Sequence, residues 1–259
     1  MVNPFLELQT EGHIVLATLK RPERRNALST PICEGLCALA DRTESEVDIR
    51  AIVVTGSGSA FCAGADLQER QALGPGARWK YVEGTNRTIR RLETVPVPVI
   101  AAVNGFALGG GVELLLACDY RIAVSNAMFG LPETALGIIP GGSQVRLLKA
   151  IGHSKMAWMT YTAERFDAHR ALELGLVDEV VADLTELRYR SMDLAQTIAR
   201  NAPLALRAAK KLNCRLQDDY IESAMVVAEQ VRAPLDDTED CLEGLNAFNE
   251  KRAPRFKGC

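Results

Sequence analysis

The spacing of apolar residues divides the chain into a mixed first part and a helical last part. Residues 5–10 and 13–20 alternate between apolar and polar positions on either side of Gly12, which predicts a β-hairpin. Short apolar runs rich in β-branched residues are typical of buried strands. Such runs predict strands at 50–55, 97–103 and 176–181.

Apolar residues three or four positions apart predict helices between these strands. The first helix follows Ser29, a favourable N-cap residue, and has Pro31 in its first turn. His153 is expected in a turn between two later helices. The other helices are predicted at 67–73, 77–94 (with Trp79, Val82, Ile89 and Leu92 on its apolar side), 112–118, 143–151, 155–162 and 167–174.

The pattern changes at Asp183, because no strand pattern follows this residue. Helices are predicted there at 183–200, 203–216, 218–232 and 237–251. The pattern alone therefore predicts an α/β fold with an α-helical end. We expect two regions, a core over residues 1–182 and a helical region over residues 183–259.

The composition narrows the class of protein. The 259 residues suffice for one large domain, and 47% hydrophobic and 24% charged residues are ordinary for a soluble globular protein. A net charge of −3 argues against a general nucleic-acid-binding protein. The N-terminus lacks a basic stretch followed by an apolar core, and no apolar run reaches about 18 residues. We therefore expect no secretory signal and no membrane span.

The cysteines and histidines do not predict a metal site. The seven cysteines form no C-x-x-C pair, and the sequence has three histidines. An odd number of cysteines without framework spacing fits reduced thiols in a cytosol-like compartment. We therefore expect a cytoplasmic protein without bound metal.

The stretch from Pro96 to Gly142 holds the candidate chemistry. A buried strand is followed there by Gly109, Gly110 and Gly111, which open a helix. Glycines allow a ligand to come close to the backbone, and a helix N-terminus leaves N–H donors free. This segment therefore predicts a site for an anion or a developing oxyanion.

Two carboxylates lie in the same stretch. Glu113 stands in an otherwise apolar helix, and Glu133 follows twenty positions later. Two carboxylates in different environments can divide acid and base work between them. The alternative is structural, with Glu113 facing the helix dipole in the first turn and Glu133 solvated in a loop.

Two motifs together resemble those of the enoyl-CoA hydratase/isomerase (crotonase) superfamily. The first is A-G-A-D-L at 63–67, and the second is the glycine run with Glu113, in which Gly110 follows Ala65 by 45 residues. The resemblance implies a spiral of β-β-α turns followed by an α-helical C-terminal trimerisation region. It also implies a homotrimer or a dimer of trimers that acts on an acyl-CoA thioester.

The resemblance implies roles for several residues. The N–H groups of Ala65 and Gly110 would hold the thioester oxygen, and Gly141 would help to position a water molecule. Glu113 would activate this water, and Glu133 would deliver a proton to C2, without a metal or redox cofactor. The residues implied in CoA binding are Arg24, Arg25, Ala63, Asp66 and Leu67, with Phe248 and Lys251 serving the CoA of a neighbouring subunit.

Local pattern gives some of these positions a second role. Asp66 is positioned as a helix N-cap, and Arg24 and Arg25 fit a solvated basic loop as well as a phosphate site. The segment I-I-P-G-G-S-Q-V-R-L-L at 138–148 is one residue shorter than the I-P-G-x-G-G-T-Q-R-L of the family's hydratases. This departure leaves the acyl preference open.

The leading hypothesis is an enoyl-CoA hydratase, a lyase that adds water syn across the C2=C3 bond of a short or branched 2-enoyl-CoA. One alternative is a double-bond isomerase, which needs a single proton shuttle. Another is a methylglutaconyl-CoA hydratase-like protein with an RNA-binding side function. The retained pair Glu113 and Glu133 favours an enzyme, and the net charge of −3 argues against RNA binding.

Overall fold

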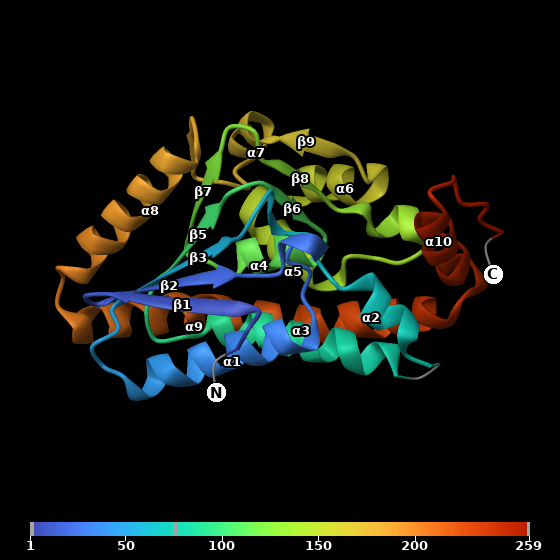
Figure 1. Cartoon of the computed structure of the whole chain (residues 1–259). Coiled ribbons are helices and arrows are strands. Elements are labelled where there is room, and N and C mark those ends of the chain that lie inside the picture. The colour runs from blue at the N-terminus through green and yellow to red at the C-terminus, as the bar shows by residue number, and fades with distance from the viewer. Residues whose placement is uncertain (1–2, 75–76, 258–259) are drawn as a thin grey trace.

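The computed structural model describes residues 3–74 and 77–257, which form two sheets covered by helices (Figure 1). The larger sheet has the order β1 (Leu6–Glu11), β2 (Ile14–Leu19), β3 (Ala51–Gly56), β5 (Val99–Val103), β7 (Tyr120–Val124), β10 (Glu179–Val181). The smaller sheet has the order β4 (Ala60–Cys62), β6 (Phe106–Leu108), β8 (Met128–Gly130), β9 (Arg165–Asp167).

The chain winds between the two sheets in repeated turns. The predicted hairpin is confirmed as the antiparallel pair β1–β2, in which Glu11 faces Ile14. Three successive strand pairs, β3–β4, β5–β6 and β7–β8, then give one strand to each sheet, and neighbouring strands of successive turns run parallel. Parallel neighbours need crossover connections, which the helices supply. This mixed α/β arrangement is the expected spiral.

Helices fill the connections and cover the sheets. The α-helices are α1 (Thr30–Ser45), α2 (Leu67–Ala72), α3 (Arg78–Glu93), α4 (Gly110–Leu116), α5 (Gly141–Ile151), α6 (His153–Thr162), α7 (Ala168–Leu174), α8 (Leu184–Ala199), α9 (Pro203–Arg232) and α10 (Glu239–Glu250). Short 3-10 helices are η1 (Pro22–Arg24), η2 (Pro132–Leu136) and η3 (Ala233–Asp237). No helix among residues 3–74 and 77–257 is long and apolar enough to cross a membrane.

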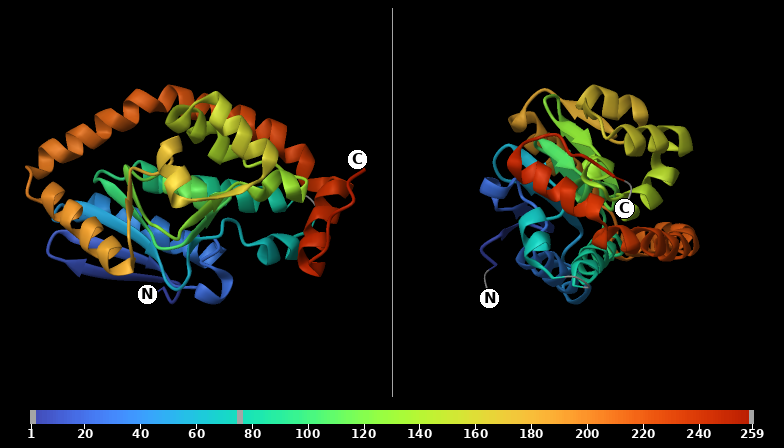
Figure 2. Two further views of the ribbon diagram at one scale, coloured as in Figure 1. Left: turned by 90° about the horizontal axis from the view of Figure 1, so that it is seen from above. Right: turned by 90° about the vertical axis from the view of Figure 1, so that its right-hand side faces the viewer.

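The C-terminal helices differ from prediction in one place. The break expected near residue 217 is wrong, because α9 runs without interruption through 30 residues. Its only proline is at the first position, where it is tolerated, and it contains no glycine. The two views of Figure 2 show α9 on the side of the molecule opposite β1. η3 then packs on α9 and α3, and α10 packs on η2.

Local predictions met mixed outcomes. The helix α1 buries the apolar residues Ile32, Leu36, Leu39 and Ala40, and Gly175 ends α7 in the left-handed conformation. Trp79 is 43% exposed, so its expected place on the apolar side of α3 is wrong. His153 begins α6 instead of lying in a turn. The six cysteines that the structure describes are not in disulfide bonds.

The core consists of one large cluster around the larger sheet and a small one near the C-terminus. The strand β5 reads V-I-A-A-V and is buried on both faces, as parallel strands covered by helices are. The small cluster consists of Ile138, Cys241 and Leu245, with Leu67 and Leu136 packed against it. It holds α10 against η2 and thereby closes one side of a cavity.

Candidate active site

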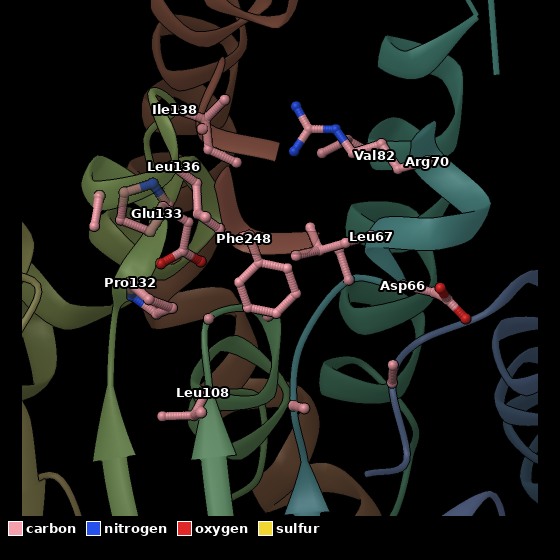
Figure 3. A pocket seen from close by; sticks show the side chains of 18 of the residues that line it. Asp66, Leu67, Arg70, Val82, Leu108, Pro132, Glu133, Leu136, Ile138 and Phe248 are labelled. Atoms are coloured by element: carbon pink, nitrogen blue, oxygen red, sulfur yellow. The ribbon is translucent and has the colours of Figure 1, made fainter. Parts of the chain in front are cut away.

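A cavity of about 680 Å³ collects most of the candidate residues. Its walls come from the loop before α2 and from α4, η2, α5, the end of α9, and α10. Figure 3 shows Glu133, Leu136 and Ile138 on one wall and Leu67 and Arg70 on the opposite one. The chain segments that build it lie far apart in the sequence, so the cavity depends on the spiral.

The backbone at Gly64–Ala65 packs directly against that at Gly109–Gly110. A Cβ on Gly64 would lie 2.8 Å from the Gly110 nitrogen, and one on Gly110 would lie 3.5 Å from the Ala65 nitrogen. Gly64 and Gly109 both have positive φ, 89° and 55°, which glycine adopts without strain. These glycines therefore bring the two predicted oxyanion donors side by side.

The N–H groups of Ala65 and Gly110 are free to bind a ligand. Gly110 is the first residue of α4, so its N–H has no partner within the helix. In the part of the chain that the structure describes, neither N–H donates to another protein group. Both residues line the cavity. Two adjacent donors of this kind can stabilise negative charge on one oxygen.

Glu113 is a buried, paired carboxylate. It is 5% exposed, and its Oε1 accepts a hydrogen bond of 2.8 Å from Nη1 of Arg146. A Cβ on Gly142 would overlap the Glu113 carboxylate, so α5 can approach only because this residue is glycine. Burial raises the pKa of Glu113 above its ordinary value, and the positive charge of Arg146 opposes this shift. Glu113 also lies in the first turn of α4, as the structural alternative expected.

Glu133 is a carboxyl group without an ion-pair partner. As a residue Glu133 is half-buried, but its Oε2 is fully covered and has no hydrogen-bond partner in the described structure. Burial, with a contribution from the charge of Glu113, raises the pKa of Glu133 to about 8. Its carboxyl is therefore mainly protonated at neutral pH, and the alternative of a solvated loop residue is wrong.

The two glutamates thus meet at one cavity with different partners. A Cβ on Gly109 would lie 2.6 Å from Oε1 of Glu133, which places this carboxyl beside the start of α4. Glu113 lies one turn further along the same helix. The arrangement brings a paired carboxylate and a neutral acid to the region where the Ala65 and Gly110 N–H groups can hold an oxygen. It can serve proton transfer in both directions.

Gly141 lies at the start of α5, close to α9. It lines the cavity together with Gly142, and a Cβ on it would lie 3.5 Å from Cδ of Arg232. The residue whose Cα faces Glu113 is Gly142, which was not among the predicted site residues. Water positioning by Gly141 stays a prediction.

The residues predicted near the CoA lie at the cavity, with one exception. Arg24, Arg25, Ala63, Asp66 and Leu67 line it. The Asp66 side chain caps α2 by accepting hydrogen bonds from the N–H groups of residues 68 and 69, which confirms its predicted role as an N-cap. The same carboxylate forms an ion pair with Arg21. Arg25 packs over the ring at position 106, 5.5 Å from its centroid.

Phe248 and Lys251, the two residues that the resemblance assigns to a neighbouring subunit's CoA, differ in their position relative to this chain's cavity. Phe248 lines the cavity of its own chain, where Figure 3 shows its ring between Leu67 and Glu133. The reason is the turn at η3, which brings α10 back so that Gly244 packs closely on the Leu136 backbone. Lys251 ends α10 and is not among the described residues that line the cavity. Service to a neighbouring subunit's CoA stays a prediction.

Sequence reasoning missed the arginines of the site. Arg146, Arg70 and Arg232 line the site or contact its glutamates, and all three are at most 6% exposed. A signal was present, since Arg146 is an isolated charge in the run S-Q-V-R-L-L. Its partner Glu113 lies 33 residues away, and no local pattern connects the two.

Comparisons with known proteins agree with this geometry. The model of the enoyl-CoA hydratase/isomerase family matches residues 9–259. The chain is 38% identical to the short-chain-enoyl-CoA hydratase of Clostridium acetobutylicum, over 95% of this chain and 94% of that protein. It is 39% identical to the mitochondrial methylglutaconyl-CoA hydratase of Mus musculus, over 98% of this chain and 82% of that protein.

A solved structure shows the same fold. The crystal structure of an enoyl-CoA hydratase from Bacillus anthracis superimposes with a TM-score of 0.79 at 39% sequence identity. The match covers 98% of this chain and 100% of that one. The family model spans nearly the whole sequence, and the hydratases of Clostridium acetobutylicum and Bacillus anthracis match 95% and 98% of this chain. The protein therefore belongs to the enoyl-CoA hydratase/isomerase family.

Proposed function

We propose that the protein is an enoyl-CoA hydratase that adds water syn across the C2=C3 bond of a short or branched 2-enoyl-CoA. The observation that carries the proposal is that two glutamates with different partners meet at one cavity. Glu113 is paired with Arg146, and Glu133 has a pKa of about 8. Hydration needs both a base for water and an acid for carbon, and this pair supplies both.

In the proposed mechanism the thioester oxygen binds the N–H groups of Ala65 and Gly110. Negative charge grows on this oxygen as water attacks C3, and fixed donors stabilise it without reorganisation. The carboxylate of Glu113 accepts a proton from the attacking water, so that a C–O bond forms at C3. The carboxyl of Glu133 then gives its proton to C2. Protons and charge balance without a metal or redox cofactor.

A double-bond isomerase is the alternative within the family. Isomerisation moves one proton between two carbons and has no use for a base directed at water. Both glutamates line the cavity, and the two curated relatives described above are named hydratases, which supports hydration. The cavity has apolar walls, formed in part by Leu67, Leu136, Ile138 and Phe248. This lining supports the proposal that the acyl group is short or branched.

A panel of 2-enoyl-CoA and 3-enoyl-CoA thioesters tests the proposal. We expect turnover of 2-enoyl-CoA substrates to 3-hydroxyacyl-CoA products, with Glu113→Gln and Glu133→Gln each slower by at least ~10²-fold. Turnover of 3-enoyl-CoA substrates alone, or loss of activity in only one of the two variants, would favour the isomerase. Circular dichroism of each variant checks that it is folded.

We also propose that the chain forms a homotrimer or a dimer of trimers. The support is a set of large apolar side chains that a single chain leaves exposed on α9. These are Leu204, Leu212, Leu216, Val226, Val227 and Val231, all more than half exposed. Exposed apolar surface of this extent usually marks an interface, and closed cyclic symmetry is the common way to cover it.

A further inference from the structure

The side chain of Asn86 is a buried polar group that the proposed mechanism does not use. Asn86 lies in α3, is 8% exposed and lines the cavity. Its carboxamide forms no hydrogen bond within the described structure. The amide is also not among the described polar atoms that are fully covered and lack a partner. The nitrogen and oxygen of Asn86 are therefore accessible from the cavity.

Helix α3 places Asn86 on the side that leads to the catalytic base. Val82 lies one turn before Asn86 and also lines the cavity. Glu93 follows Asn86 by seven residues, which is two helical turns, so the two side chains lie on the same side of α3. Glu93 binds Arg146, and Arg146 binds Glu113. Asn86 is thus positioned along the cavity, about 10 Å before the residue that contacts this ion pair.

Two other buried hydroxyl groups of the cavity wall already have protein partners. The Thr85 hydroxyl donates to the backbone oxygen of Tyr81 over 3.1 Å. The Ser143 hydroxyl donates to the backbone oxygen of Gly109 over 3.4 Å. Buried polar groups are normally hydrogen-bonded, and the few exceptions often have a function. The Asn86 carboxamide is therefore left to bond a group that occupies the cavity.

We infer that Asn86 recognises a hydroxyl group on the acyl chain beyond C3, so that the substrates include 2-enoyl-CoA thioesters with such a hydroxyl group. This inference rests on the proposed function for the placement of the thioester. A carboxamide both donates and accepts hydrogen bonds, and a hydroxyl group complements both atoms. The hydroxyl group that hydration creates at C3 is a different one, because it forms at Glu113. The amides of CoA are common to every substrate of the family.

Matched pairs of thioesters test whether the cavity accepts this group. The pairs are 4-hydroxy-2-butenoyl-CoA with 2-pentenoyl-CoA, and 5-hydroxy-2-pentenoyl-CoA with 2-hexenoyl-CoA, in which a hydroxyl replaces the terminal methyl group. We expect kcat/KM of the hydroxylated member to equal or exceed that of its partner in at least one pair. A wall without a hydrogen-bond partner would instead penalise a buried hydroxyl group. Lower kcat/KM for the hydroxylated member of both pairs would overturn the inference and leave the hydratase function standing.

A variant assigns the preference to Asn86. Asn86→Leu keeps the approximate size of the side chain and removes its hydrogen bonds, so the ratio of hydroxylated to methyl-ended kcat/KM should fall about tenfold or more. Thr88→Val should leave this ratio unchanged. Thr88 is the matched control because it is a buried polar residue of α3 that bonds the Gly84 backbone oxygen and is not among the described residues lining the cavity.

Two results with Asn86→Leu would overturn the inference. An unchanged ratio would mean that water solvates the hydroxyl group. An equal fall for both members of a pair would assign Asn86 to CoA or to the reacting carbons. Asn86→Ala, which adds no atoms, replaces Asn86→Leu if the larger side chain prevents folding.

Binding measurements separate this inference from the hydratase proposal. Calorimetry with the same four thioesters is done on Glu113→Gln, in which hydration should be slow, with and without Asn86→Leu. The ratio of affinities should again fall about tenfold or more when Asn86 is replaced. If the wild type hydrates no enoyl-CoA but this fall is seen, the hydratase proposal fails and hydroxyl recognition stands. If the wild type is a hydratase and the ratio does not change, only hydroxyl recognition fails.

Discussion

Nη1 of Arg146 lies 2.8 Å from Oε1 of Glu113, and the pair is buried between α4 and α5. The same guanidinium binds Glu93 through Nη2, also over 2.8 Å, and donates to the backbone oxygen of Gly142. Arg146 therefore joins the predicted base to α3 and to the start of α5. Its charge favours the ionised form of Glu113 against the effect of burial.

Replacing Arg146 should change the pH dependence of catalysis. In Arg146→Gln the pKa of Glu113 rises further, because burial is no longer opposed by a positive charge. The base must be ionised, so the acidic limb of the kcat/KM profile should move to higher pH. Arg146→Lys keeps a charge and should move the limb less. An unmoved acidic limb in folded Arg146→Gln would show that Arg146 does not set the state of Glu113.

The raised pKa of Glu133 predicts the alkaline limit of activity. The proposed acid works only while protonated, so kcat/KM should fall as the pH rises through about 8. Removing the proton donor in Glu133→Gln should lower turnover by at least ~10²-fold at every pH and abolish this limb. The alkaline limb is measured from a profile of kcat/KM between pH 6 and 10, recorded at constant ionic strength for the wild type and the variant. An alkaline limb that survives in Glu133→Gln belongs to another group.

The raised pKa of Glu133 also predicts that the Glu133→Gln variant becomes more stable than the wild type as the pH rises above 4.5. The folded-state pKa of Glu133 is raised from 4.5 to about 8, so the folded state holds this proton more tightly than the unfolded state. The stabilisation is fully present below pH 4.5 and is lost as the pH rises to about 8, at up to about 1.4 kcal/mol per unit. Glu133→Gln does not ionise and should gain stability relative to wild type across this window. Urea denaturation at pH 5 and pH 8 would detect the difference, and parallel wild-type and variant curves would contradict it.

Gly142→Ala should lower turnover, because the added methyl group would meet the Glu113 carboxylate. Its new Cβ would overlap the Glu113 carboxylate, so the carboxylate must move away from its place in the cavity. We expect turnover to fall by at least about tenfold, because misplacement of a catalytic group by an ångström is costly. Gly84→Ala is the matched control, since a Cβ at this position in α3 meets no atom within 4 Å. Equal turnover in the two variants would mean that the position of Glu113 is not critical.

Sequence patterns predicted the strands of the larger sheet better than those of the small second sheet. The run at Val99–Val103 was readable as a buried strand, whereas β6 and β8 have three residues each and carry no periodicity of their own. These strands form because successive turns of the spiral hydrogen-bond to one another. The break expected near residue 217 does not occur, and α9 packs along α5 as one continuous helix.

The catalytic motifs were visible in the sequence, but their partners were not. Gly110 and Glu113 stand close together in one local pattern, which is why both could be predicted. Arg146 joins Glu113 across 33 residues, and Arg70 joins Asp236 across 166. Such pairs depend on how the chain winds, because arginine in an amphipathic helix is ordinarily solvated. The same reasoning applies to Phe248, whose place in the cavity depends on the turn at η3.

The exposed apolar face of α9 predicts an assembly of three or six chains. Leu204 is 80% exposed and Leu216 is 74% exposed in a single chain. Burying such side chains stabilises by roughly 25 cal/mol per Å², so association is favoured when copies of α9 meet apolar surface. Light scattering should report a mass of about three or six times 28.2 kDa. Leu204→Glu with Leu216→Glu should lower this mass, because an interface would then bury two unpaired charges. Val47→Glu is the control, since Val47 is 65% exposed but lies outside the helical region. A monomeric wild-type protein with full activity at nanomolar concentration would contradict the prediction, and it would agree with Phe248 serving the cavity of its own chain.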